Sequence, residues 1–223
     1  MQRSNLLLNQ FNHRLTLRGI VPLQNNCIYS NANPLQWQNG QYRFVNNLNF
    51  VTSRDILYSA TCKYMEKVTF NTSGNNFAIA IGYNPASNSN TTIDKTNYLI
   101  SSHFFNQGYD GYYLFNMYPD ITPTKIRKSN SVLGNYIDIV FGFLNGYAHI
   151  NSHDVFIFWG SSVYLSNNII NQIILLQNQC RALYTFGVGG IHHQHPSRGV
   201  AVNTIRHYNA NTGPLQNGIH YLL

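Results

Sequence analysis

The residues best suited to metal chemistry in this chain are three histidines in a glycine-rich stretch, residues 189–199. His192, His193 and His195 lie within four positions of one another, and on an extended chain His193 and His195 project to the same side. Neutral imidazoles are common ligands of transition metals, so the stretch is a candidate metal site. A His-x-His pair has no fixed distance to a third ligand, and a surface loop whose histidines hydrogen-bond to the backbone is the simpler interpretation.

Catalysis by side chains alone has little support in the sequence. His149, His153 and Asp154 lie near Ser152, but no G-x-S-x-G turn presents a nucleophile, and neighbours on a strand point to opposite faces. Glu66 is the only glutamate, and the six aspartates are spread singly along the chain. We therefore expect no catalytic residues and no cofactor, and a protein that is not an enzyme.

Aromatic side chains are the better candidates for binding, because they make up 14% of the chain and include sixteen tyrosines. Several lie at or beside expected turns, where a ring could stack on a sugar or on a partner's surface. The candidates for such a ligand surface are Tyr109, Tyr112, Tyr113, Trp159 and Arg198. The alternative is that the tyrosines fill the core and cap its ends.

The net charge of +7 and the pI near 9.4 would attract phosphates or an anionic surface. The basic residues are scattered, however, and only Lys125, Arg127 and Lys128 form a local cluster. Without an arginine-rich arm, few counterions would be released on binding. We expect weak contact with nucleic acid at most, through these three residues.

The elements that must position these residues are mostly strands. At residues 56–64, apolar and polar side chains alternate with a period of two, which predicts a strand with one buried face. The same habit predicts strands over residues 42–50, 68–70, 77–83, 98–105, 112–118, 136–143, 155–159, 184–188 and 200–208. Asp138 would be a buried carboxylate within one of them and would need a partner.

One segment has a helical period instead. From residue 167 onward, Ile169, Ile173, Leu176, Cys180 and Leu183 recur at spacings of four and three, which is one face of a helix. We predict a helix over residues 167–179, with Ser166 as its N-cap. A strand of β-branched residues at 170–175 is the alternative.

These elements predict one all-β domain over residues 1–223, with an extended segment at about 1–40. Eight to ten strands and one short helix are typical of a jelly-roll-like or Greek-key β-sandwich; a closed barrel is the alternative. The length of 223 residues suits a single β domain. Cys27, Cys62 and Cys180 fit no metal spacing and are expected to be small buried residues.

The composition gives little information about function. Charged residues make up 9% of the chain and asparagine is abundant, which gives a polar, uncharged surface that could pack against copies of itself; codon bias explains the asparagine equally well. In composition and expected fold the chain is similar to subunits of viral shells and fibre heads. We therefore expect a self-assembling viral capsid or appendage subunit, located in a virion or an extracellular assembly.

Two alternatives remain open at this stage. The first is a lectin-like module that binds a carbohydrate or a cell-surface receptor, and the second is a metal-dependent enzyme using the histidine cluster. The apolar run within Met1–Gln10 is too short for a secretory signal, and no run of apolar residues reaches the length of a membrane helix.

Overall fold

The computed structural model describes residues 5–38, 44–85, 89, 92–122, 131–158, 166–186 and 205–207. In these ranges the elements are α1 (Leu6–Thr16), β1 (Leu23–Ile28), β2 (Leu35–Gln38), β3 (Phe44–Leu48), β4 (Ser53–Tyr58), β5 (Lys63–Thr69), β6 (Phe77–Gly82), β7 (Thr92–Ile93), α2 (Lys95–Asn106), β8 (Gly111–Asn116), α3 (Tyr136–Leu144), the short 3-10 helix η3 (Ile150–Ser152), β9 (Asp154–Ile157), α4 (Asn167–Gln179), β10 (Ala182–Phe186) and β11 (Ile205–His207).

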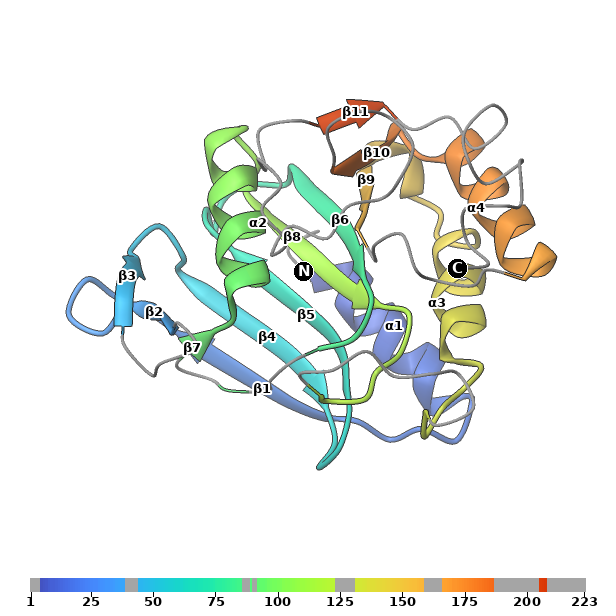
Figure 1. The fold of residues 1–223 in the computed structure, drawn as a ribbon, viewed down its shortest axis with the longest axis horizontal. Helices are drawn as coiled ribbons and strands as arrows, with labels where there is room; N and C mark the ends of the chain where they lie inside the picture. Colours follow the sequence, from blue (N-terminus) through green and yellow to red (C-terminus); the bar gives the residue numbers. More distant parts are fainter. Residues whose placement is uncertain are drawn as a thin grey trace.

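The main sheet is mixed, with the strand order β1-β4-β5-β8-β6-β9-β10-β11 (Figure 1). Strands β1, β4, β5 and β8 are antiparallel neighbours, whereas β8, β6, β9 and β10 are parallel. A small second sheet has the order β3-β2-β7. Parallel strands need crossover connections, and here helices α2, α3 and α4 supply them.

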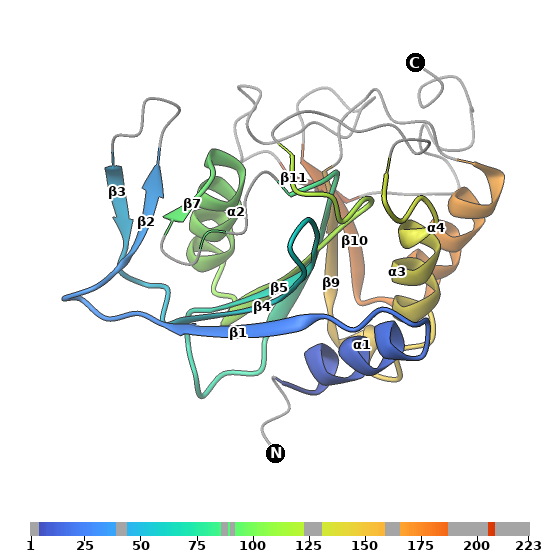
Figure 2. The same cartoon turned by 90° about the horizontal axis from the view of Figure 1, so that it is seen from below.

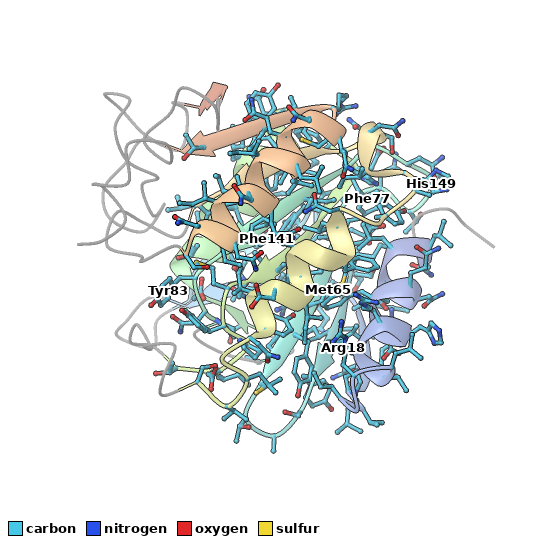
Figure 3. The ribbon with its side chains drawn as sticks, turned by 90° about the vertical axis from the view of Figure 1, so that its right-hand side faces the viewer. Arg18, Met65, Phe77, Tyr83, Phe141 and His149 are labelled. Carbon is cyan, nitrogen blue, oxygen red and sulfur yellow. The ribbon has the colours of Figure 1, made fainter. Side chains whose placement is uncertain are left out.

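Helices cover both faces of the sheet. In Figure 2, α2 lies on one side of β9 and β10, and α3 and α4 lie on the other. Strand β6 shows why, because its alternate residues enter two different cores: Ile79 and Ile81 pack with α1, α3 and α4, while Ala78 and Ala80 pack with α2. Figure 3 looks onto the layer of α1, α3 and α4, against which Met65 and Phe77 pack.

The predicted all-β sandwich is therefore wrong. Residues 98–105, expected as a strand, lie in α2, and residues 136–143 lie in α3. The extended segment expected at about 1–40 contains α1, β1 and β2. The expected strand at 56–64 is the end of β4 and the start of β5, joined by a turn.

Other predictions agree with the structure. Helix α4 spans the predicted residues, its buried side is Ile169, Ile173 and Leu176, and the Ser166 hydroxyl accepts a hydrogen bond from the Ile169 amide. The strands expected at 77–83, 112–118 and 155–159 correspond to β6, β8 and β9. Among the described residues, no helix combines the length and the apolar character needed to cross a membrane.

Candidate ligand-binding site

The parallel part of the sheet contains a point where the chain reverses its direction of travel. From β6 the chain crosses through α2 to β8 on one side, and from β8 it crosses through α3 to β9 on the other side of β6. Neighbouring parallel strands on opposite sides of such a point have their crossover helices on opposite faces. Ligands of open α/β sheets bind outside the carboxyl ends of the strands at such a point. A ligand site is therefore expected at the carboxyl ends of β6, β8 and β9.

Three residues meet on the α2 side of this edge. Gly82 ends β6 and is paired in register with Asn116, the last residue of β8. Phe158 directly follows β9, and its backbone amide donates to the Ile81 carbonyl at 3.0 Å. A Cβ atom added to Gly82 would lie 2.9 Å from Asn116 Oδ1 and 2.9 Å from Phe158 Cε2. The absence of a side chain at Gly82 therefore leaves the space that the amide and the ring occupy beside the backbone of β6.

The Asn116 amide is the unusual group of this edge. The residue is 4% exposed and its side chain has no hydrogen bond to a described residue, but its amide atoms are not among the fully buried groups without a partner. Most polar side chains that are this well buried have a partner in the protein. The Asn116 amide is therefore able to exchange water for a hydrogen bond to a ligand.

The loops beyond the strands are fixed to one another by backbone bonds. The amides of Met117 and Tyr118 donate to the carbonyls of Gly82 and Tyr83, both at 3.0 Å. Farther out, Thr122 donates to the Pro85 carbonyl at 2.9 Å, and the Asn84 side chain donates to the Thr122 carbonyl at 2.7 Å. The segments after β6 and β8 therefore leave the sheet together, as a continuation of the strand pair.

Two tyrosines stand on these segments. The rings of Tyr83 and Tyr118 meet edge to face, with centroids 5.3 Å apart. Burial raises the pKa of both hydroxyls, and that of Tyr118 reaches about 12. Both hydroxyls are therefore protonated at neutral pH and are able to donate hydrogen bonds.

A buried ion cluster lies under α2 and supports the loop between β6 and α2. Glu66 on β5 accepts from Arg54 Nε at 2.6 Å and from Lys63 Nζ at 2.8 Å. Arg54 also donates through Nη1 to the carbonyl of Ser89, in the loop after β6, at 3.0 Å. Burial opposes the charge on Glu66, but Arg54 and Lys63 outweigh it and lower the pKa of the carboxyl group to about 2. The cluster is therefore ionised and helps to hold the loop that leaves the candidate site.

The opposite edge of the sheet holds a second polar group, and Figure 3 shows Tyr83 and His149 at opposite ends of the molecule. There Asp154, at the start of β9, accepts from Tyr109 Oη at 2.6 Å and from Arg181 Nη2 at 2.5 Å. His153 Nδ1 lies 2.6 Å from the Phe77 carbonyl oxygen, and burial lowers the pKa of this imidazole. These side chains link the amino ends of the strands, and none forms a nucleophile and base pair with Ser152, whose hydroxyl donates to the His149 carbonyl.

The tyrosines predicted to bind a ligand do not share a surface. Tyr112 is buried beneath α2, where its hydroxyl lies 2.9 Å from Ser101 Oγ. Tyr113 is buried on the other face of β8, beside Phe77, and Tyr109 is held by Asp154. Asp138, expected in a strand, lies on α3 and accepts from the Asn168 side chain at 2.9 Å.

The remaining predicted site residues lie outside the described residues. These are Trp159 and Arg198, the histidines His192, His193 and His195, and the basic residues Lys125, Arg127 and Lys128. Within the part of the chain that the structure describes, no group of three or more metal-ligating side chains comes together. Cys27, Cys62 and Cys180 are free thiols, and Cys62 alone of them is fully buried.

The group at the carboxyl edge was not predicted from the sequence. Asn116 does not stand out in a chain rich in asparagine. Gly82 follows an apolar run, where a glycine usually marks a turn. Two features of the sequence together would have located it. Two apolar strands end in Gly82 and Asn116, and these strands are parallel neighbours if residues 98–105 form the crossover helix between them.

Comparisons with known proteins give a family and a distant structural match. No curated protein matches the chain. A solved structure from Bacteroides fragilis NCTC 9343, described as that of a proposed acetyl xylan esterase, matches at 12% identity with a TM-score of 0.31, over 81% of this chain and 51% of that one. The chain thus spans about half the length of that protein, and a TM-score this low supports no transfer of fold or activity. The family model described as "Protein of unknown function (DUF1643)" matches residues 64–197, more than half of the chain, and the chain belongs to this family.

Proposed function

We propose that the chain binds a planar ring that offers hydrogen bonds along its edge, and that a nucleobase is the best fit. The observation that supports this proposal is the Asn116 amide, which has no hydrogen bond to a described residue although the residue is only 4% exposed, and which lies beside the Phe158 ring next to Gly82. An asparagine side chain carries an acceptor and two donors, which complement the carbonyl and N–H groups of a base. Proteins that bind an unstacked base read its edge through hydrogen bonds and hold its face against an aromatic ring.

Charge favours a ligand with phosphate. The chain carries a net charge of +7. The summed charge of a positive protein attracts anionic ligands before they reach the binding site. A nucleotide or a stretch of nucleic acid would supply both the base and the negative charge. The site lies in residues 64–197, the part of the chain matched by the family model.

Titration calorimetry with nucleoside monophosphates, and with ribose 5-phosphate as the ligand that lacks a base, tests the proposal. We expect at least one nucleotide to bind more tightly than ribose 5-phosphate. Asn116→Ala should weaken that nucleotide's binding by roughly ten- to a hundredfold, the equivalent of a lost hydrogen bond to a buried group. Asn75→Ala, which changes an exposed asparagine before the start of β6, is the matched control and should bind as the wild type does.

Two results would contradict the proposal. One is equal binding of ribose 5-phosphate and all nucleotides, which would indicate attraction by charge alone. The other is unchanged binding in a folded Asn116→Ala variant.

The predicted jelly-roll sandwich is wrong, because the fold is mixed α/β, and the similarity to subunits of viral shells loses the fold on which it depended. Self-association does not depend on a jelly roll and stays a prediction. The glycan-binding alternative stays a prediction, although two of the tyrosines that it named, Tyr112 and Tyr113, are buried on opposite faces of β8.

A further inference from the structure

The charge of the chain is not spread evenly along its sequence. All seven carboxylates belong to the described residues, together with eight of the fourteen lysines and arginines, so this part of the chain is nearly neutral. The segments outside the described residues contain no carboxylate and six basic residues: Arg3, Arg43, Lys125, Arg127, Lys128 and Arg198. The net charge of +7 therefore comes almost entirely from these segments.

The connection from β8 to α3 carries three of the six basic residues, and its two ends meet beyond the carboxyl end of β8. The Asp120 carboxylate accepts hydrogen bonds from the Val132 amide at 2.9 Å and from the Ser131 hydroxyl. The described residues thus fix where residues 123–130 leave the sheet edge and where they return to it. Between these two points the sequence contains Lys125, Arg127 and Lys128 and no carboxylate.

The connection from β10 to β11 begins and ends at the same edge. Strand β10 is parallel to β9, so its last residue, Phe186, lies at the carboxyl edge. Phe186 is paired with Ile205, the first residue of β11. The sequence between these two residues contains Arg198 and again no carboxylate. Two basic connections therefore start from the edge at which Asn116 lies.

We propose that the ligand of this site is a single-stranded nucleic acid, with one unpaired base at Asn116 and Phe158 and its backbone phosphates along the carboxyl edge of the sheet. The inference rests on the proposed function and adds the class of the ligand. A base within a duplex is paired along its edge and stacked on its faces, so it has to leave the duplex to meet a side-chain amide and an aromatic ring.

The distribution of charge favours a chain of phosphates over a single nucleotide. A mononucleotide presents its charge at one point, whereas the basic residues belong to two connections that start from different strands. Each phosphate contact on a single strand releases counterions and steepens the slope of log K against log salt by about 0.7. A carboxylate in these connections would repel the phosphates, and the sequence of both connections lacks one.

Fluorescence anisotropy with a short labelled single strand, measured at several salt concentrations, tests the inference. We expect the single strand to bind roughly tenfold or more tightly at low salt than any nucleoside monophosphate, because several phosphates take part. It should also bind more tightly than a blunt duplex of the same sequence, in which no base is free to enter the site.

Two double variants separate local charge from net charge. Lys125→Gln with Lys128→Gln should make the slope of log K against log salt shallower by about 1. The matched control is Arg14→Gln with Arg18→Gln, which removes the same charge from α1 and the residues after it and should keep the wild-type slope. Figure 3 shows Arg18 well apart from Tyr83, which directly follows β6 at the carboxyl edge.

Asn116→Ala gives the complementary result. It should weaken binding of the single strand by roughly tenfold or more, as the loss of a hydrogen bond from a base does. The slope against salt should stay unchanged, because an amide releases no counterions.

Three outcomes would overturn the inference. The first is a single strand that binds no more tightly than a mononucleotide whose own binding Asn116→Ala weakens, and this result would leave the proposed function in place. The second is a single strand that binds Asn116→Ala as tightly as the wild type, which would also count against the proposed function. The third is an equal change of slope in the two double variants, which would indicate attraction by net charge alone.

Discussion

At the scale of single residues, the candidate site has a polar side chain where an apolar one would favour folding more. Asn116 ends the buried strand β8, and an apolar side chain of the same size would have no polar group to remove from water there. Places where a sequence breaks such a rule are often functional sites. The site residues predicted from the sequence are reactive or aromatic, and neither property identifies an amide that has no hydrogen bond to a described residue.

Asn116→Leu should stabilise the protein without ligand and abolish nucleotide binding. The leucine is close to asparagine in size and has no polar group to desolvate, so we expect the free energy of unfolding to rise by about 1–2 kcal/mol. Denaturant unfolding and calorimetry on the same preparation measure both effects. A destabilised Asn116→Leu variant would show that the amide has a structural partner, and the functional interpretation would then lose its basis.

At the scale of elements, the strands β6, β8 and β9 were predicted, whereas three of the four α-helices, α1, α2 and α3, were not. Helix α3 is buried on nearly all sides, including Ile137, Val140, Phe141 and Leu144, and a short continuous apolar run cannot be assigned to helix or strand by its period. In α2 the helical face contains buried polar residues, Asn97, Ser101 and His103, beside Ile100 and Phe104. Counted as polar, they conceal the helical period and leave an apparent alternation.

The start of α2 depends on one cap. The Asp94 carboxylate accepts from the Asn97 amide at 2.8 Å, which satisfies one of the free N–H groups of the first turn. Asp94→Ala should reduce the free energy of unfolding by about 1 kcal/mol, within the usual range for caps. Urea denaturation of the variant measures this loss.

A matched control comes from α3. Its N-cap residue Asn135 makes no hydrogen bond to its helix through the side chain, so Asn135→Ala should cost much less than Asp94→Ala. Equal losses in the two variants would contradict the role assigned to the Asp94 carboxylate.

At the scale of the whole molecule, the sheet joins two different parts. Strands β1, β4 and β5 form an antiparallel part, and β8, β6, β9 and β10 form a parallel part with crossover helices. Alternation along a strand is the same for both orientations, so the sequence predicted strands without predicting the fold class. Only the helices between strands distinguish the two arrangements, and two of the three crossovers were assigned as strands.

The buried cluster around Glu66 links the two parts. Its ions come from β4 and β5, while Asn97 of α2 and Ser89 of the loop after β6 bond to the same cluster at 3.4 Å and 3.0 Å. The pKa of Glu66 falls from its ordinary value near 4.5 to about 2 in the folded chain, since Arg54 and Lys63 outweigh the effect of burial. A depressed carboxyl pKa contributes stability above the unfolded value, and that contribution is lost as pH falls from about 4.5 toward about 2.

Glu66→Gln should therefore change both the level and the pH dependence of stability. At neutral pH the variant leaves Arg54 and Lys63 buried without their counter-ion, and we expect a loss on the order of 3–5 kcal/mol. Between pH 4.5 and 2 the variant should lose less stability than the wild type does, because one carboxylate fewer takes up a proton. Asp138→Asn, which removes a carboxylate from the outer side of α3, is the matched control and should follow the wild-type curve closely. Parallel acid limbs for Glu66→Gln and the wild type, measured by chemical denaturation at a series of pH values, would show that Glu66 does not link the two parts of the sheet through its charge.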